Sequence, residues 1–223
     1  MGGRRRIFVP IFLAIGLALS HPLPASASTT AGLWYMDETS GTTATDSSSN
    51  HNDGTLHDVG FVTPGYNGSG GAYSFNGTSS QVIVPNSSSL SPGSSDISIS
   101  VHVNFTVKPS STVGDYDVVR KGKGSQYYKI EILGSGKAFC SFHGSSNNGS
   151  VTISPVLDDG KWHTITCKKT SGSVSGTVDG KTTSKNVTIG SISNSASLVF
   201  SGKASGSGDF YNGLMDEVSI SVG

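Results

Sequence analysis

The stretch DGKWHTITCKKTSGSVSGTVDGK, residues 159–181, contains two runs in which apolar and polar side chains alternate. Alternation with a period of two is typical of β-strands that are buried on one face only. The second run ends at Asp179-Gly180, a pair that readily adopts the positive φ angles of a type I′ turn. The stretch therefore predicts two strands and a tight hairpin turn.

The same pattern recurs along the chain, in short runs separated by Gly, Asn, Asp, Ser and Pro. Glutamate occurs only at positions 38, 131 and 217, and no long run has apolar residues at helical spacing. About a dozen strands in one domain predict an all-β sandwich of two antiparallel sheets packed face to face. The other expected strands are residues 31–36, 71–75, 81–84, 97–107, 116–121, 127–133, 137–143, 151–156, 198–202 and 214–221.

The first residues have the features of a secretory signal peptide. Arg4, Arg5 and Arg6 precede an apolar run, and Ala25-Ser26-Ala27 supplies the small residues of a cleavage site. The alternative is a membrane anchor, but the run is shorter than the ~20 residues that a span needs. We therefore expect residues 1–27 to be a signal peptide, and residues 28–223 to be one secreted domain.

The charge pattern bears on the partners of that domain. The formal net charge is zero, and the lysines and arginines are spread along the chain. Phosphate backbones and anionic membrane surfaces are bound by clustered basic residues. We therefore expect no nucleic-acid partner, and no membrane association after signal cleavage.

The two cysteines and their neighbouring histidine bear on enzyme chemistry. An exported chain with two cysteines favours a disulfide, here between Cys140 and Cys167 on neighbouring or facing strands. His163 shares a strand face with Ile165 and Cys167. This position favours a hydrogen-bonded structural histidine over a general base that would activate a catalytic nucleophile. The histidines show no zinc-binding spacing, and no GxSxG motif indicates a Ser/His/Asp triad.

Six segments occur together in one order: AGLWYMDETSGTTATDSSSNHNDGTL (31–56), GGAYSFNGTSSQVIVP (70–85), DISISVHVNF (96–105), LDDGKWHTITC (157–167), VDG (178–180) and YNGLMDEVSIS (211–221). This series resembles the LamG-like branch of the concanavalin A-like lectin/glucanase superfamily, in the form common in secreted actinobacterial proteins. The resemblance covers essentially the whole of residues 28–223. It implies a jelly-roll sandwich with one curved sheet and a disulfide.

The superfamily that the chain resembles includes enzymes, but the carboxylate pattern of this sequence favours a non-catalytic protein. Glycosidases of this fold carry carboxylates closely spaced along one strand, in a pattern such as ExDxxE, and that pattern is absent. Glu131 is the only glutamate in the middle of an expected strand, and it has no acidic neighbour nearby on that strand. Asp115 and Asp117 share a face, and we interpret them as solvated acids at the start of a strand.

The resemblance also implies a structural calcium ion, for which oxygen ligands are required. The matching positions are Asp37 in the first acidic turn, Asn76 or Gly77 after a following strand, and Asp216 in the last strand. The alternative is that Asp37 and Asp216 are turn and edge residues that cap backbone NH groups.

Sugar-binding surfaces combine exposed aromatic rings with polar side chains. The candidates are Tyr127 and Tyr128, of which one must point away from the core, together with Phe210 and Tyr211. The leading hypothesis is a binding module for carbohydrate or another cell-surface polymer. A structural or adhesion protein with protein partners is the alternative, and an unrecognised glycosidase or lyase ranks third.

Overall fold

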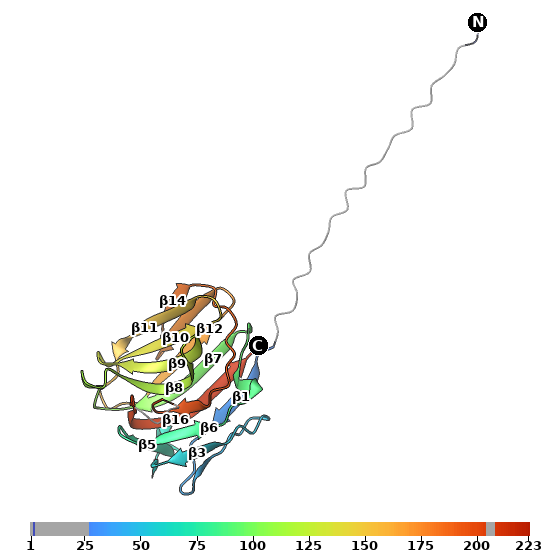
Figure 1. Ribbon diagram of the computed structural model, residues 1–223. Helices are drawn as coiled ribbons and strands as arrows, with labels where there is room; N and C mark the ends of the chain where they lie inside the picture. The colour runs from blue at the N-terminus through green and yellow to red at the C-terminus, as the bar shows by residue number, and fades with distance from the viewer. Residues whose placement is uncertain (1, 3–26, 204–207) are drawn as a thin grey trace.

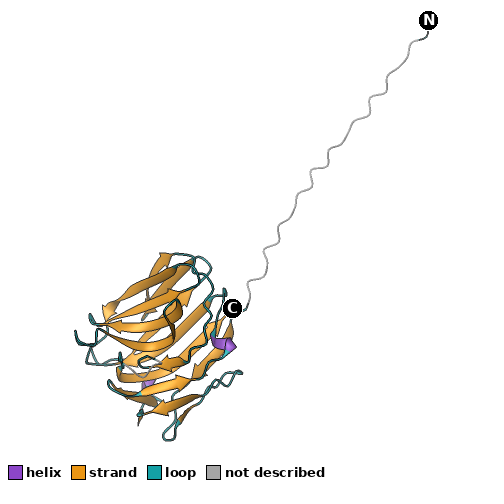
Figure 2. Ribbon diagram, viewed as in Figure 1, coloured by secondary structure: helices purple, strands orange, loops and turns teal. Residues whose placement is uncertain are grey.

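The computed structural model describes residues 2, 27–203 and 208–223. Apart from residues 2 and 27, the predicted signal peptide lies outside the described residues. These residues form sixteen strands and two single-turn 3₁₀ helices, η1 (Tyr66–Gly68) and η2 (Ser88–Leu90) (Figure 2). Within this part of the chain, neither helix approaches the length and apolar character that a membrane crossing needs.

The strands form two eight-stranded antiparallel sheets, which confirms the predicted sandwich. Figure 1 shows the strands lying in two layers. Sheet A has the order β14 (Lys181–Asn186), β13 (Ser173–Val178), β12 (His163–Lys169), β7 (Ile97–Asn104), β16 (Asn212–Val222), β5 (Ala72–Asn76) and β4 (Gly60–Val62), with β1 (Thr29–Trp34) paired to β16. Sheet B has the order β11 (Asn148–Val156), β10 (Lys137–His143), β9 (Gln126–Leu133), β8 (Asp115–Lys123), β15 (Leu198–Phe200), β6 (Gln81–Val84), β3 (Gly54–His57) and β2 (Thr43–Ala44).

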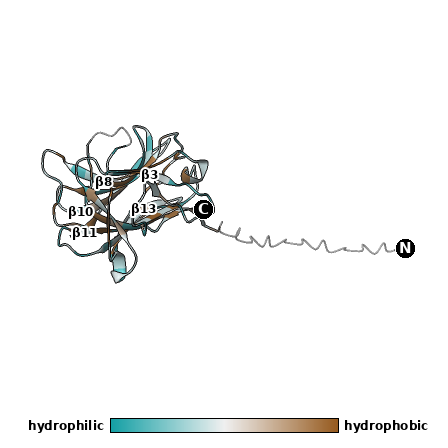
Figure 3. Cartoon of the chain, turned by 90° about the horizontal axis from the view of Figure 1, so that it is seen from below, coloured by the Kyte–Doolittle hydropathy of each residue, from teal (hydrophilic) through white to brown (hydrophobic). Residues whose placement is uncertain are grey.

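The core lies between the sheets and follows from the alternation. In β7 the residues at odd-numbered positions are buried and those at even-numbered positions are partly exposed. The buried set Ile97, Ile99, Val101 and Val103 is at most 2% exposed. In Figure 3 the brown hydrophobic segments fall mainly on the strands, and the loops are mostly teal.

The hairpin predicted at residues 178–181 is present. Val178 of β13 pairs with Lys181 of β14, which leaves a loop of Asp179 and Gly180. Their φ angles are 47° and 82°, both positive as a type I′ turn requires. Because β14 is exposed along its whole length, it has no apolar pattern and could not be predicted from periodicity.

Cys140 and Cys167 form the predicted disulfide, with their Cα atoms 5.5 Å apart. Cys140 lies in β10 of sheet B, and Cys167 lies in β12 of sheet A. The bridge therefore joins the two facing sheets across the core, and neither sulfur is free to act as a nucleophile or as a metal ligand.

His163 is the hydrogen-bonded structural histidine that the alternation predicts, since it is only 8% exposed. Its Nδ1 lies 2.6 Å from Oδ2 of Asp179, and its Nε2 lies 3.0 Å from Oδ1 of Asp159. Burial lowers the pKa of His163, but the two carboxylates outweigh burial and raise the pKa above its ordinary value of 6.5. The imidazolium thus ties the 178–181 turn to the loop that precedes β12.

This arrangement predicts a pH-dependent contribution to stability. Because the folded pKa of His163 is raised, its contribution is fully present below pH 6.5 and is lost as pH rises through the folded pKa. Both carboxylates are partly exposed, so we expect His163→Gln to lower the free energy of unfolding by about 1 kcal/mol at pH 6. Urea unfolding of both proteins at pH 6 and pH 8.5 tests this, and a deficit that is equal at both pH values would contradict it.

Candidate functional site

The outer face of sheet B over β8, β9 and β10 carries a continuous polar and aromatic surface. Along β9, Tyr128, Ile130 and Ile132 point into the core and are fully buried. The intervening residues therefore point outward, and strand pairing places them beside outward residues of β8 and β10. The outward set is Asp115, Asp117, Arg120, Gly122, Tyr127, Lys129, Glu131, Leu133, Phe139, Ser141 and His143.

Tyr127 lies at the centre of the aromatic part of this face. Its ring stacks against His143, with centroids 5.3 Å apart and an angle of 25° between the planes. The guanidinium carbon of Arg120 lies 5.8 Å from the Tyr127 centroid, and Nζ of Lys129 lies 5.5 Å from it. Tyr127 is half-buried, so this cluster presents ring surface and hydrogen-bond donors together.

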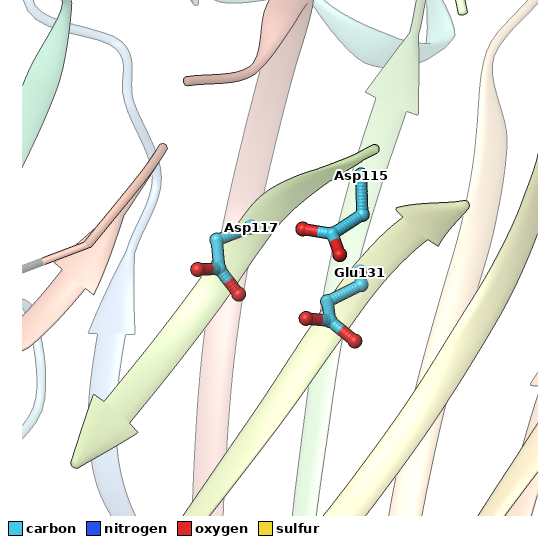
Figure 4. A group of neighbouring side chains, drawn as sticks. All are labelled: Asp115, Asp117 and Glu131. Carbon is cyan, nitrogen blue, oxygen red and sulfur yellow. The ribbon is translucent and has the colours of Figure 1, made fainter. Parts of the chain in front are cut away.

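Three carboxylates, those of Asp115, Asp117 and Glu131, gather on β8 and β9, as Figure 4 shows. Asp117 of β8 pairs directly with Glu131 of β9, and Asp115 lies one outward position away on β8. Each of the three offers an oxygen within 4.8 Å of the others'. The interpretation of Asp115 and Asp117 as solvated acids is wrong for Asp117, which is 0% exposed.

Two basic side chains balance part of this charge. Nη1 of Arg120 donates to Oδ2 of Asp117 at 2.7 Å, and Lys129 forms an ion pair with Oε1 of Glu131. Burial raises the pKa of Glu131 to about 7, although Lys129 opposes this shift. Burial also raises the pKa of Asp117, against the effect of Arg120.

Of the four aromatic residues that the sequence suggested for ligand contact, Tyr127 is the one on this face. Tyr128 and Tyr211 are fully buried and bonded within the core, so these two predictions are wrong. The hydroxyl of Tyr128 donates to the Leu90 carbonyl, and that of Tyr211 donates to the Leu214 carbonyl. Phe210 is half-buried, and its ring lies close to Gly202.

The predicted calcium ligands Asp37 and Asp216 meet at one loop, residues 65–71. The NH of Gly71 donates to Oδ1 of Asp37, and the NH of Tyr66 donates to Oδ2 of Asp216, both at 2.7 Å. Burial raises the pKa of Asp216 to about 6, and the Asp37 charge adds to this shift. Both aspartates thus cap backbone NH groups, as the alternative interpretation predicts. Two carboxylates that approach the same loop would also suit a hard cation.

The structure does not bring Asn76 and Gly77 to these aspartates. Asn76 pairs with Asn212 at one end of the β5–β16 ladder, whereas Asp216 lies beyond the other end of that ladder, about 13 Å away at the rise of a β-strand. Oδ1 of Asn76 accepts hydrogen bonds from the backbone NH groups of residues 78–80. Asn76, and with it Gly77, therefore caps its own turn and lies too far from Asp216 to share an ion with it.

A second aromatic cluster, which sequence analysis missed, lies on the outer face of sheet A. The Tyr66 ring stacks on His102 with centroids 3.6 Å apart, and Trp162 meets Tyr66 edge-on at 6.0 Å. His102 is held by Glu217 at 3.1 Å and by Thr164 at 2.9 Å. The alternation places His102 and Trp162 at outward positions, which could have indicated a surface cluster. Only the fold brings Tyr66 beside them.

Fold and sequence define the class of this protein as a lectin-like β-sandwich. The chain belongs to the concanavalin A-like lectin/glucanases superfamily, whose family model matches residues 76–222. No curated protein matches the chain by sequence.

Solved structures share the fold at low sequence identity. The binding domain of Paraclostridial mosquitocidal protein 1 is 17% identical, with a TM-score of 0.69 over 86% of this chain and 48% of that chain. Domain 4 of AbnA, an extracellular arabinanase from Geobacillus stearothermophilus solved with arabinotriose, is 16% identical. Its TM-score is 0.62, over 88% of this chain and 93% of that domain. The botulinum neurotoxin DC binding domain, solved with SialylT, is 12% identical. Its TM-score is 0.60, over 86% of this chain and 47% of that domain. The chain thus spans about half the length of the two toxin domains.

Proposed function

We propose that this protein is an exported, non-catalytic module that binds carbohydrate through the outer face of sheet B. The observation that carries the proposal is the half-buried Tyr127–His143 pair, set among the side chains of Arg120, Lys129 and Ser141. The face of an aromatic ring packs against the C–H groups of a sugar ring, and cationic and hydroxyl groups donate to sugar hydroxyls. The arabinanase domain bound to arabinotriose and the neurotoxin domain bound to SialylT support the carbohydrate class, since both have this fold.

The absence of catalysis is part of the same proposal. Asp117 and Glu131 approach each other as closely as the carboxylates of retaining glycosidases, which are about 5 Å apart. Here, however, each is paired with a basic residue, and the side chain of Asp117 is 0% exposed. A sugar on the surface would therefore not contact Asp117. Release of sugar from a polysaccharide panel, abolished by Glu131→Gln, would contradict this part of the proposal.

The Tyr127→Ala variant is expected to lose binding at least tenfold, which is about 1.4 kcal/mol, on the glycans that the wild-type protein recognises on a glycan array. The ring contributes contact surface and orders His143, whereas the fold does not depend on it because it points outward. Tyr35→Ala is the matched control, since Tyr35 is a 45% exposed tyrosine elsewhere on the surface. An array on which wild type and Tyr127→Ala give equal signals would contradict the proposed face.

We further propose that Asp37 and Asp216 hold a structural calcium ion beside the 65–71 loop. The ion would link the turn after β1 to the last strand and so stabilise the closed sandwich. Calcium added to chelator-treated protein is expected to raise the melting temperature by several degrees, and Asp216→Asn is expected to abolish most of that rise. A melting temperature that does not respond to calcium in the wild type would remove this ion from the account.

A further inference from the structure

Sheet B carries a group of buried polar atoms whose bonding is incomplete. Three buried side-chain atoms of the described residues have no hydrogen-bond partner: Oδ1 of Asp115, Oδ1 of Asp117 and Nδ1 of His143. All three belong to outward positions of β8 and β10. Leaving a buried carboxylate oxygen without a partner costs free energy, and such atoms in native structures commonly bind water or an ion.

The charges around Asp115 and Asp117 do not balance. Four carboxylates lie together here, those of Asp115, Asp117, Glu131 and Asp209, since the Asp209 charge raises the pKa of Asp115. Three basic residues each pair with one of these acids: Arg120 with Asp117, Lys129 with Glu131, and Lys203 with Asp209. Asp115 has no basic partner within the described chain. When all four acids are ionised, the three bases leave one negative charge in excess.

Arg120 and Lys129 each bind only one oxygen of the carboxylate with which they pair. Arg120 binds Oδ2 of Asp117, so the unpartnered Oδ1 remains available, and Lys129 binds Oε1 of Glu131, which leaves Oε2. Ligand oxygens at 2.3–2.6 Å from a calcium ion lie up to about 5 Å apart. One oxygen from each of the three acids lies within 4.8 Å of the others, a spread that a calcium ion accommodates.

We propose that Asp115, Asp117 and Glu131 form a calcium-binding site on the outer face of sheet B, separate from the Asp37 and Asp216 pair. Arg120 holds Oδ2 of Asp117 and Lys129 holds Oε1 of Glu131. The other oxygens of these two carboxylates, together with Asp115, bind the ion. Asp115 is only partly buried, so the ion reaches the site past its side chain. This proposal does not depend on carbohydrate binding.

Calorimetric titration of calcium into chelator-treated protein tests the proposal without a sugar ligand. The wild type is expected to bind a calcium ion at the sheet B site, and Asp115→Asn and Asp117→Asn are each expected to weaken this event at least tenfold. Asn keeps an oxygen that can accept from Arg120, and a circular dichroism spectrum like that of the wild type confirms folding. Asp216→Asn is the matched control and is expected to leave this event unchanged.

The outcomes separate the two metal sites. Calcium binding that survives in Asp115→Asn and Asp117→Asn, but is lost in Asp216→Asn, would overturn the sheet B site and leave only the Asp37–Asp216 ion. If calcium titrated into the Asp216→Asn variant released or absorbed no heat of binding, the proposed sheet B site would also be overturned. If Asp117→Asn does not fold, the more exposed Asp115→Asn decides the result.

Discussion

Replacing Trp34 by Ala is expected to lower the free energy of unfolding by about 3–5 kcal/mol, the range for removing a fully buried tryptophan. Trp34 is 0% exposed at the end of β1, and its ring meets Phe200 edge-on with centroids 5.1 Å apart. Its Nε1 also donates to the Asn52 carbonyl at 3.1 Å. The substitution therefore creates a cavity between the sheets and leaves that acceptor unpaired.

Equilibrium unfolding in guanidinium chloride measures this effect, with Trp162→Ala as the matched control. Trp162 is partly exposed on the outer face of sheet A, so its loss is expected to cost less than about 1.5 kcal/mol. If Trp34→Ala cost no more than Trp162→Ala, then β1 would not be part of the core that the structure describes.

Removing the disulfide is expected to have the second-largest effect. Cys140 and Cys167 are 27 residues apart, and the chain-entropy relation gives about 3–4 kcal/mol for closing a loop of this length. The double variant Cys140→Ala/Cys167→Ala is expected to lose roughly that much free energy of unfolding. Both sulfurs are fully buried between the sheets, so the loss of side-chain packing adds to the entropic effect.

The measurement compares unfolding of the wild type, the double variant and the reduced wild type. Reduction alone should reproduce most of the loss, because it opens the bridge without changing the side chains. Equal unfolding midpoints for oxidised and reduced protein would contradict a bridge that constrains the two sheets.

The strands with a one-sided apolar pattern could be predicted from the sequence. The runs at 81–84 and 137–143 coincide with β6 and β10, and the run at 97–107 contains β7. The strands that were missed are β2, β3, β4 and β14. Three of these have two to four residues, too few to show a period, and β14 has no buried residue at all.

The candidate site was less predictable because it depends on pairing between strands. The sequence indicated that Tyr127 or Tyr128 points outward, and only the register of β9 against its neighbours assigns that position to Tyr127. Asp117 and Glu131 are 131 − 117 = 14 residues apart, so no motif along one strand contains both. An irregularity between Asp117 and Val119 shifts the register of β8, which local sequence does not reveal.

The calcium prediction came from the resemblance and stays a prediction. Asp37 and Asp216 approach one loop although 216 − 37 = 179 residues separate them, because β16 pairs with β1 and β5. Asn76 has the chemistry of a calcium ligand, but it caps its own turn. A turn-capping asparagine and a metal-ligating asparagine have the same local sequence, and only the fold distinguishes them.

The central claim is that carbohydrate binds to the outer face of sheet B. The most direct test is an NMR titration of labelled protein with the oligosaccharide that gives the strongest array signal, followed residue by residue. The account predicts shift changes at Tyr127, Lys129, Ser141 and His143, and little change at Tyr66, His102 and Trp162 on the opposite sheet. Changes centred on the Tyr66–Trp162 cluster, with β8–β10 unperturbed, would contradict it.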